Sequence, residues 1–227
     1  NYMINCFLNL SLMLCIVFCA SKDSRFTEFL SYQIDLDNTI LADLPHNDYD
    51  SWTNIRNDGI KVKYTSDFEI PWCRSSANFR FSQDEIYSAL KDLKNYKNIF
   101  DRVSVSKLLS QEDDIAYIRL NMPWPYSDRD YTVRFLESRD NNDIIFQFYS
   151  VTHPNTPNNT GSVTLPRAGG EWRLTYIDNN RTQVTYTWNG ELLGNFPNYG
   201  LTTAWETQGS EVLIWLNEYL KTRRNND

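Results

Sequence analysis

The residues best suited to chemistry stand in one short segment, NMPWPYSDRDYTVRF, between Asn121 and Phe135. Here Asp128, Arg129 and Asp130 place two carboxylates around a guanidinium, a grouping that could exchange protons or hold a charged ligand. The triplet, however, follows two prolines and directly precedes an alternating apolar run, as residues at the start of a β-strand do. The sequence therefore favours a structural interpretation, in which the prolines end one strand and the triplet fixes the start of the next through paired polar contacts.

The other titratable residues form no catalytic or metal-binding motif. The two histidines, His46 and His153, lack metal-ligand spacing to a second His, Cys or carboxylate. Asp113 and Asp114 fall in a turn-rich segment, where solvation explains them. Cys73 has no neighbouring histidine in the sequence, so we interpret it as a buried thiol rather than a nucleophile.

Size and charge limit the classes of function. The chain has 227 residues, enough for one sizeable domain, and its 22 basic and 29 acidic residues give a formal net charge of −7. No segment concentrates Lys and Arg enough to neutralise a phosphate backbone, so we expect no nucleic acid partner. The basic C-terminal segment KTRRNND is interpreted as a solvated helix end, with its cations near the negative end of the helix dipole.

The first residues have the composition of an export leader. An apolar run from Ile4 to Cys19 turns polar at Ser21, which suits the core of a secretory signal better than a membrane-spanning helix. We expect a signal peptide or a lipoprotein leader, with Cys19 lipidated in the second case, and hence an exported protein that is periplasmic, secreted or a cell-envelope lipoprotein. The predicted segments are residues 1–21 as the leader, 22–45 as a linker with a short helix, 46–222 as the folded domain and 223–227 as a tail.

Alternating apolar residues predict a largely antiparallel sheet. Ile60, Val62 and Tyr64 predict a first strand after an Asn-Asp-Gly turn, with ANFRFS as its hairpin partner. Further strands are predicted at Val103–Leu109, Ile115–Met122, Tyr131–Ser138, Ile144–Val151, Glu171–Ile177 and Thr182–Asn189. Short, turn-rich connections predict that neighbouring strands run antiparallel, and Gly169–Gly170 is interpreted as a turn.

Two segments have helical spacing. Ser82 followed by Glu85 forms a capping box and predicts a helix from Gln83 to Tyr96. Apolar residues from Leu201 to Leu220 predict a long amphipathic helix, with Gly209 as a candidate kink. This last helix alone is long and apolar enough to cover a curved sheet. The sequence therefore predicts an α+β fold, in which a curved antiparallel β-sheet wraps around a long C-terminal helix.

The side chains expected to face that helix are unusually bulky. They are Tyr117, Tyr131, Val133, Phe135, Phe146, Phe148, Trp172, Leu174, Tyr176, Val184, Tyr186 and Trp188. Such side chains can form either a packed core or a tunnel walled by aromatic rings. Composition alone favours the packed core.

Four segments, in order, carry a family resemblance. They are SWTNIRNDGIKVKYT, EIYSALKDLKNYKNIFDRV, MPWPYSDRDYTVRF and GGEWRLTYIDNNRTQVTYTWNGELLGNFPNYGL. The third resembles the Pro-Trp-Pro-x-x-x-Arg-Asp signature of START domains, the lipid transfer family related to the steroidogenic acute regulatory protein. The others resemble the family's opening Trp and the strand that follows it, its helix (with Phe100 where Trp is common) and its late strands with the link to the last helix. The resemblance spans Trp52 to Leu220.

The resemblance implies a helix-grip fold that holds one lipid in a hydrophobic tunnel between the sheet and the last helix. Sterol-carrying members place an acid and a base on neighbouring strands of the tunnel, and the matching positions here, Ala116 and Phe135, are uncharged. Arg119 could instead contact a headgroup, or lie at the sheet margin with a carboxylate partner. The expected ligand-binding residues are Tyr117, Arg119, Tyr131, Val133, Phe135, Phe146, Phe148, Trp172, Tyr186, Trp188, Trp205, Val212, Leu213 and Leu216.

The expected function is non-catalytic binding, with transfer, of a lipid or other hydrophobic small molecule. We expect a monomer that needs no metal or cofactor and contacts membranes transiently, with the last helix or a loop at residues 137–144 or 189–200 moving to admit the ligand. One alternative is a packed structural or interaction module without a ligand. Another is an enzyme of the helix-grip superfamily, cyclase-like or hydrolase-like, with a pocket acid such as Glu171.

Overall fold

The structure is a computed structural model that describes residues 40–158, 160–194 and 196–226. The predicted leader and most of the predicted linker lie outside the described residues, so export and lipidation at Cys19 stay predictions. In the described part of the chain, no helix is long and apolar enough to cross a membrane.

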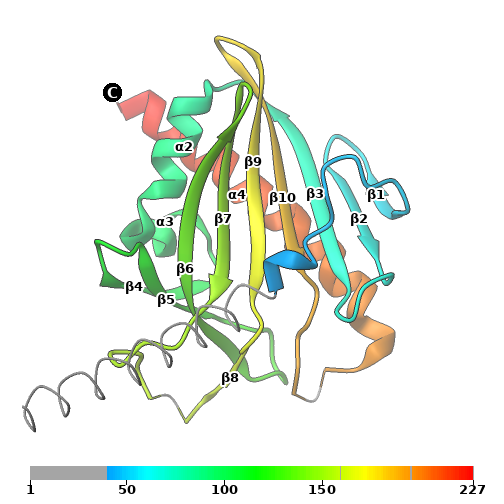
Figure 1. The fold of residues 1–227 in the computed structure, drawn as a ribbon, viewed down its shortest axis with the longest axis vertical. Helices are drawn as coiled ribbons and strands as arrows, with labels where there is room; N and C mark the ends of the chain where they lie inside the picture. Colours follow the sequence, from blue (N-terminus) through cyan, green and yellow to red (C-terminus); the bar gives the residue numbers. More distant parts are fainter. Residues whose placement is uncertain (1–39, 159, 195, 227) are drawn as a thin grey trace, which may run out of the picture. The chain divides into compact units, whose positions relative to one another are not determined.

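Ten strands form one sheet in the order β1-β2-β3-β10-β9-β7-β6-β5-β4, with β8 paired to β6 (Figure 1). The strands are β1 Thr53–Asn57, β2 Lys61–Thr65, β3 Trp72–Phe79, β4 Val103–Ser110, β5 Ile115–Leu120, β6 Asp128–Asp140, β7 Asp143–Ser150, β8 Ser162–Thr164, β9 Gly169–Asp178 and β10 Arg181–Asn189. All pairs are antiparallel except β6 with β8. The predicted antiparallel sheet is thus confirmed, while β1 and β8 had not been predicted and β3 begins at Trp72, ahead of the predicted strand ANFRFS.

The helices are α2 Gln83–Lys91, the 3-10 turn η1 Leu93–Asn95, α3 Tyr96–Ile99, the 3-10 turn η2 Asn198–Gly200 and α4 Leu201–Asn226. The predicted capping box is present, because the Ser82 side chain accepts from the Glu85 backbone and the Glu85 side chain accepts from the Ser82 backbone. The predicted single helix is divided, since Asp92 leaves the helical region with φ −79 and ψ 67.

The long helix α4 crosses one face of the sheet, with α2 and α3 beside it (Figure 1). It continues to Asn226, through residues that had been expected to form a tail. Gly209 lies within the uninterrupted helix, where it permits close packing: a Cβ there would come within 2.7 Å of the Trp188 ring and 3.1 Å of Val62. Gly209 is therefore a contact point between α4 and the sheet.

A second, smaller layer lies on the other face of the sheet. Ile40, Ile70, Trp72 and Tyr149 form an apolar cluster there. Arg74 of β3 donates to the backbone oxygens of Pro45 at 2.7 Å and His46 at 3.2 Å. Residues 40–52, the described part of the chain before β1, are thus held on the outer face of the sheet, away from α4.

Two predicted features of β9 were wrong. Gly169 and Gly170 begin the strand instead of forming a turn, and a Cβ at Gly170 would lie 2.3 Å from the Thr187 oxygen and 2.7 Å from the Phe148 ring. Tyr176, expected to face α4, is 44% exposed and donates to the Asn179 side chain in the β9–β10 hairpin. The β9–β10 hairpin extends past the core, so the alternation of apolar residues along β9 continues to Tyr176, where no helix covers the sheet.

Candidate functional site

A cavity of about 530 Å³ lies between the sheet and the first half of α4. Aromatic side chains from β6, β7, β9 and β10 wall one side: Tyr131, Phe135, Phe148, Trp172, Tyr186 and Trp188. Three of these rings form a stack, with Trp172 and Tyr186 centroids 4.4 Å apart and Tyr186 and Trp188 centroids 4.9 Å apart. The stack arises because these positions alternate on one face of paired strands β9 and β10.

The remainder of the interior is packed. Phe146 lies between Phe135, at 4.9 Å between ring centroids, and Tyr87, at 6.2 Å. Leu213 and Leu216 of α4 are buried in the same core. The bulky residues therefore divide between two parts of the interior: a packed core towards α2 and a cavity towards the start of α4.

Helix α4 divides its apolar surface between these two parts. One stripe, Trp205, Gly209, Leu213, Leu216 and Leu220, is buried in protein contacts. The neighbouring stripe, which includes Ala204, Gln208, Glu211, Val212 and Trp215, lines the cavity. Residues recur every three or four positions in each stripe, with Glu211 and Val212 adjacent in the second, so a single helix can pack the core and line the cavity at once.

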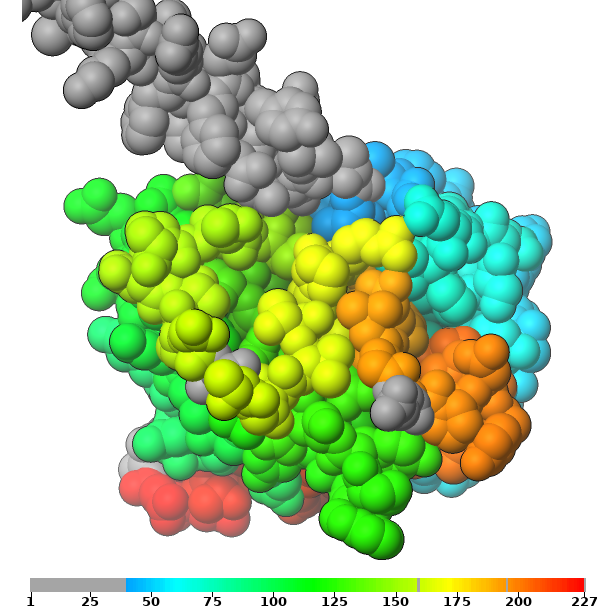
Figure 2. All heavy atoms as spheres, turned by 90° about the horizontal axis from the view of Figure 1, so that it is seen from below, coloured from blue at the N-terminus to red at the C-terminus, as the bar shows by residue number. Residues whose placement is uncertain are grey.

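Two connections border the cavity near the start of α4: residues 121–127, between β5 and β6, and residues 190–200, between β10 and α4. The Tyr126 and Phe196 rings bring these connections together, with centroids 4.6 Å apart. Figure 2 views this end of the domain, where the segment near residue 125 (bright green) and the segment from about 190 to 205 (orange) lie at the surface. Trp124 and Tyr199, one in each region, are 92% and 91% exposed.

Arg129 makes hydrogen bonds to both connections. Its side chain is buried, its Nε donates to the Leu192 oxygen at 2.6 Å, and its Nη2 donates to the Leu193 oxygen at 2.9 Å. It also donates to the oxygen of Ser127. Burial lowers the pKa of Arg129 below the usual range, with Asp128 opposing the effect. The N–H groups of Arg129 thus donate to backbone oxygens at the edge of the cavity.

The other charged residues that line the cavity are also paired. Arg102 of the α3–β4 turn donates from Nε to Glu211 at 2.6 Å. Glu191 accepts from Arg167 at 2.8 Å. By contrast, the hydroxyls of Tyr131 and Tyr186 and the amide of Gln208 make no hydrogen bond to any residue in the described ranges. The unengaged polar groups of the lining are therefore uncharged.

The predicted site residues fall into three groups. Those that line the cavity are Tyr131, Phe135, Phe148, Trp172, Tyr186, Trp188 and Val212. Those that pack in the core without lining it are Val133, Phe146, Trp205, Leu213 and Leu216. Tyr117 and Arg119 belong to neither group, because β5 turns Ala116 and Ile118 inward and these two side chains to the outer face.

The placement of Tyr117 and Arg119 corrects the predicted facing of β5. Arg119 pairs with Asp128 at 2.8 Å, which is the sheet-margin interpretation of this residue. The Tyr117 hydroxyl donates to Asp130 at 3.1 Å. Residues Ile115 to Ile118 are all buried, so both faces of this part of β5 are covered. Alternation could not show which side of this strand faced α4.

The Asp-Arg-Asp triplet has the predicted structural role. Asp128 pairs with Arg119 and accepts from the Met122 backbone at 3.1 Å. Asp130 accepts from the Thr164 hydroxyl at 2.6 Å and from Ser162, which fastens β8 to β6. The triplet therefore fixes the start of β6, and only its arginine reaches the cavity.

Several cavity residues were missed from the sequence. They include Leu120, Met122, Pro123, Tyr126, Leu165, Phe196, Tyr199, Ala204, Gln208 and Trp215. Most stand in connections without periodicity, and the helical ones form a stripe beside the leucines that dominated the pattern. The spacing from Ala204 to Gln208, Val212 and Trp215 was the available signal.

The structure offers little to the catalytic alternatives. Glu171, the proposed pocket acid, lies on the outer face, where it accepts from Gln147 at 2.9 Å and pairs with Arg173 at 3.0 Å. Burial raises the pKa of the Cys73 thiol well above its usual value. Within residues 40–158, 160–194 and 196–226, no group of three His, Cys, Asp or Glu side chains is placed to hold a metal ion.

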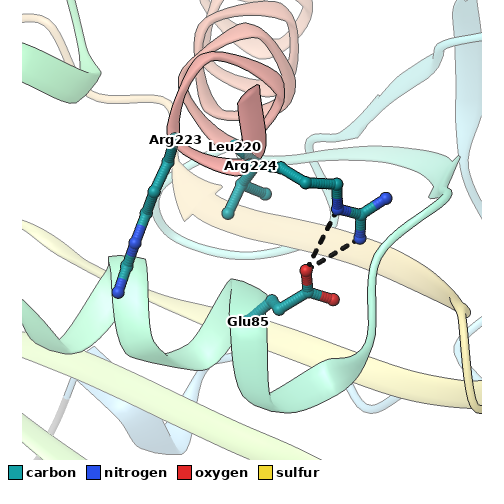
Figure 3. Close-up of a pocket in the computed structure, with 4 residues that line it drawn as sticks. All are labelled: Glu85, Leu220, Arg223 and Arg224. Carbon is teal, nitrogen blue, oxygen red and sulfur yellow. Dashed lines mark hydrogen bonds and ion pairs between the residues drawn. The ribbon is translucent and has the colours of Figure 1, made fainter. Parts of the chain in front are cut away.

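A second, smaller pocket of about 300 Å³ lies between α2 and the end of α4, lined by Glu85, Leu220, Arg223 and Arg224 (Figure 3). Figure 3 shows Arg224 directed at Glu85, and their closest atoms are 2.7 Å apart. Arg223 points to α2, where it approaches the Ser88 hydroxyl at 3.5 Å. The pocket thus lies where the basic C-terminal end of α4 contacts α2.

Comparisons with known proteins agree with this architecture. No family model matches the sequence. A curated but uncharacterised protein of Pseudomonas aeruginosa is 25% identical over 146 residues, which cover 63% of this chain and 72% of that protein. The crystal structure of a STAR-related lipid transfer protein (fragment 25–204) from Xanthomonas axonopodis is 25% identical, with a TM-score of 0.65, and the match covers 76% of this chain and 99% of that one.

A human structure extends the comparison. StAR-related lipid transfer protein 5 has a TM-score of 0.67 at 14% identity, over 91% of this chain and 97% of the human one. The expected resemblance to START domains is therefore confirmed, and the α+β helix-grip fold is the one that the sequence predicted.

Proposed function

We propose that this START-fold chain binds one lipid or similar hydrophobic molecule in the cavity between its sheet and α4, without catalysing a reaction on it. The observation that carries the proposal is the cavity itself, about 530 Å³ and walled mainly by aromatic and aliphatic side chains. This volume is in the range of pockets that hold a single small ligand, about 300–1,000 Å³. Each methylene moved from water into such a site contributes about 0.8 kcal/mol.

The polar lining supports binding over catalysis. Both carboxylates at the cavity, Glu191 and Glu211, are paired with arginines. A general acid or base needs a free proton position near the ligand and a pKa suited to its task. Burial raises the pKa of the Tyr131 and Tyr186 hydroxyls above their usual values, which makes them weaker proton donors.

We further propose that the ligand is collected from and delivered to membranes at the end of the domain seen in Figure 2. Trp124 and Tyr199 are almost fully exposed there, one in each of the two connections that border the cavity. Amphipathic Trp and Tyr side chains partition into the interface of a bilayer. The mobile part would then be the 190–200 connection, one of the predicted gates. Export through the leader and a monomeric state stay predictions from the sequence.

A cavity-filling variant tests the binding proposal. Val212→Trp adds a large ring where α4 lines the cavity, so it should lower the uptake of a fluorescent lipid by about tenfold or more while the protein stays folded. Ile214→Trp, two residues along α4 at a position 42% exposed, is the matched control and should bind as the parent does. Native mass spectrometry of protein purified from a lipid-containing host would show the bound molecule directly.

Two results would count against the proposal. One is parent protein that is empty after purification and takes up no fluorescent lipid. The other is equal uptake by parent, Val212→Trp and Ile214→Trp, which would place the binding outside this cavity.

A further inference from the structure

The cavity also indicates what kind of polar group its ligand carries. We infer that the ligand presents one uncharged oxygen group, such as a hydroxyl, carbonyl or ester, to the hydroxyls of Tyr131 and Tyr186. The inference rests on the proposed function and narrows it, from hydrophobic ligands in general to neutral lipids. Ionic lipids, whose headgroups are carboxylates or phosphates, are the class that it disfavours.

The two tyrosines are placed for this contact. Tyr131 of β6 and Tyr186 of β10 stand on the cavity face of the sheet and line the cavity from different strands. Neither hydroxyl has a hydrogen-bond partner among the described residues. A hydroxyl that is removed from bulk water without a partner is unfavourable, so an atom inside the cavity is expected to satisfy each one.

The charge state of the tyrosines restricts that atom to an uncharged group. Burial raises the pKa of both hydroxyls, and Tyr131 raises that of Tyr186 further, so both stay neutral at physiological pH. A neutral phenol can donate to an ether, carbonyl or hydroxyl oxygen and accept from a hydroxyl. It cannot balance the charge of a buried carboxylate or phosphate, which strongly disfavours burial unless a cation pairs with it.

The cations at the cavity are engaged elsewhere. Arg129 donates to the backbone oxygens of Ser127, Leu192 and Leu193. Arg102 makes two hydrogen bonds to Glu211, at 2.6 and 3.1 Å. An anionic headgroup would have to displace one of these partners. A neutral headgroup would leave both arrangements intact and use the tyrosines and Gln208.

Three probes with the same chain separate these classes: dodecane, dodecanol and dodecanoate, each used at neutral pH to displace the dye Nile red from the full-length protein. We expect dodecanol to compete at least about tenfold better than dodecanoate and several-fold better than dodecane. Tyr131→Phe and Tyr186→Phe remove one hydroxyl each, so either change should weaken dodecanol about 2- to 10-fold and leave dodecane unchanged. Tyr149→Phe makes the same change on the outer face of the sheet and should alter nothing.

The outcomes distinguish the two proposals. If Nile red does not bind and no probe is taken up, the proposed function fails, and this inference with it. If dodecanoate competes as well as dodecanol or better, the protein binds hydrophobic molecules but the inference is wrong. A preference for dodecanol that survives both tyrosine changes, in variants with unchanged thermal unfolding, would overturn the assignment to these hydroxyls.

Discussion

Arg129 should control the stability of the connection from β10 to α4. Its buried guanidinium donates to the oxygens of Leu192 and Leu193, which stand in residues 190–200 at the edge of the cavity. Leu193 has a φ of 49 and Gly194 a φ of 62, a left-handed conformation that L side chains such as that of Leu193 adopt only when neighbouring contacts support it. In Arg129→Met the side chain keeps much of its apolar volume and loses every donor.

The magnitude follows from the groups that lose their partner. Within the β10–α4 connection two backbone oxygens, those of Leu192 and Leu193, lose a hydrogen bond, and each loss is destabilising by about 1–1.5 kcal/mol, hence about 2–3 kcal/mol there. Part of this loss is offset because the variant no longer buries a cation. An opening free energy lowered by about 2 kcal/mol corresponds to hydrogen exchange about 30-fold faster in residues 190–200.

Hydrogen exchange with mass spectrometry, read peptide by peptide, is the assay. The matched control is Arg119→Met, since the Arg119 side chain is 27% exposed and pairs with Asp128 on the other face of the sheet. The pair is partly buried, but both of its residues stand outside residues 190–200, so the control should leave that connection unaffected. If both variants exchange at the parent's rate in this connection, Arg129 does not hold it, and the reasoning from its hydrogen bonds is refuted.

Three further predictions concern the core and the junction between α2 and α4. Leu213→Ala should lower the free energy of unfolding, measured in urea, by about 2–5 kcal/mol, because Leu213 is buried in the core. Ile214→Ala, at an exposed position, should change it by less than about 0.5 kcal/mol. Similar losses in both variants would contradict the assignment of Leu213 to the packed stripe of α4. Burial alone would raise the pKa of Glu85, but hydrogen bonds from Arg224 and Ser82 outweigh burial and hold this pKa below its ordinary value of 4.5. A carboxyl group whose pKa is lowered by folding stabilises the folded state at pH values above its unfolded pKa, so this contribution to stability should fade as the pH falls below about 4.5. The Glu85→Gln variant should lack that part of the pH dependence of unfolding. Cys73 is fully buried with a raised thiol pKa, so peptide mass spectrometry should find it unlabelled by iodoacetamide until the domain unfolds, and rapid labelling of native protein would disprove its burial.

The sequence predicted the fold well because, over most of the chain, the apolar residues that recur with strand or helix spacing are the ones that face the neighbouring layer. In β6 and β10, apolar residues alternate with polar ones and the apolar side chains face α4, so the predicted strands overlap the observed ones. The family resemblance then supplied the topology, which period alone does not determine. Predictions failed where a strand was buried on both faces, as in β5, or extended past the core, as at Tyr176.

The position of the cavity was harder to predict than the fold. Trp188 and Phe146 are both buried aromatic residues on inward strand faces, yet only Trp188 lines the cavity. Hydrophobicity measures how strongly a side chain avoids water, and an apolar cavity satisfies that preference as a packed neighbour does. The difference between the two residues therefore depends on the volumes of the facing side chains.

Helix α4 shows where such volume information resides in this chain. Its packed stripe is rich in leucine, at positions 213, 216 and 220, and each of these side chains is at most 3% exposed. Towards the start of α4 its cavity stripe has Ala204, Gln208 and Val212, which are smaller or more polar than leucine and leave space under the aromatic sheet, and the bulky Trp215 comes only at its far end. Because both stripes have helical spacing, a periodicity analysis merges them into one wide apolar face. Comparing side-chain volume and polarity between adjacent stripes of α4 would separate the packed stripe from the cavity stripe. The cavity stripe lines the same cavity as Tyr131 and Tyr186, whose uncharged hydroxyls we propose to bind the ligand.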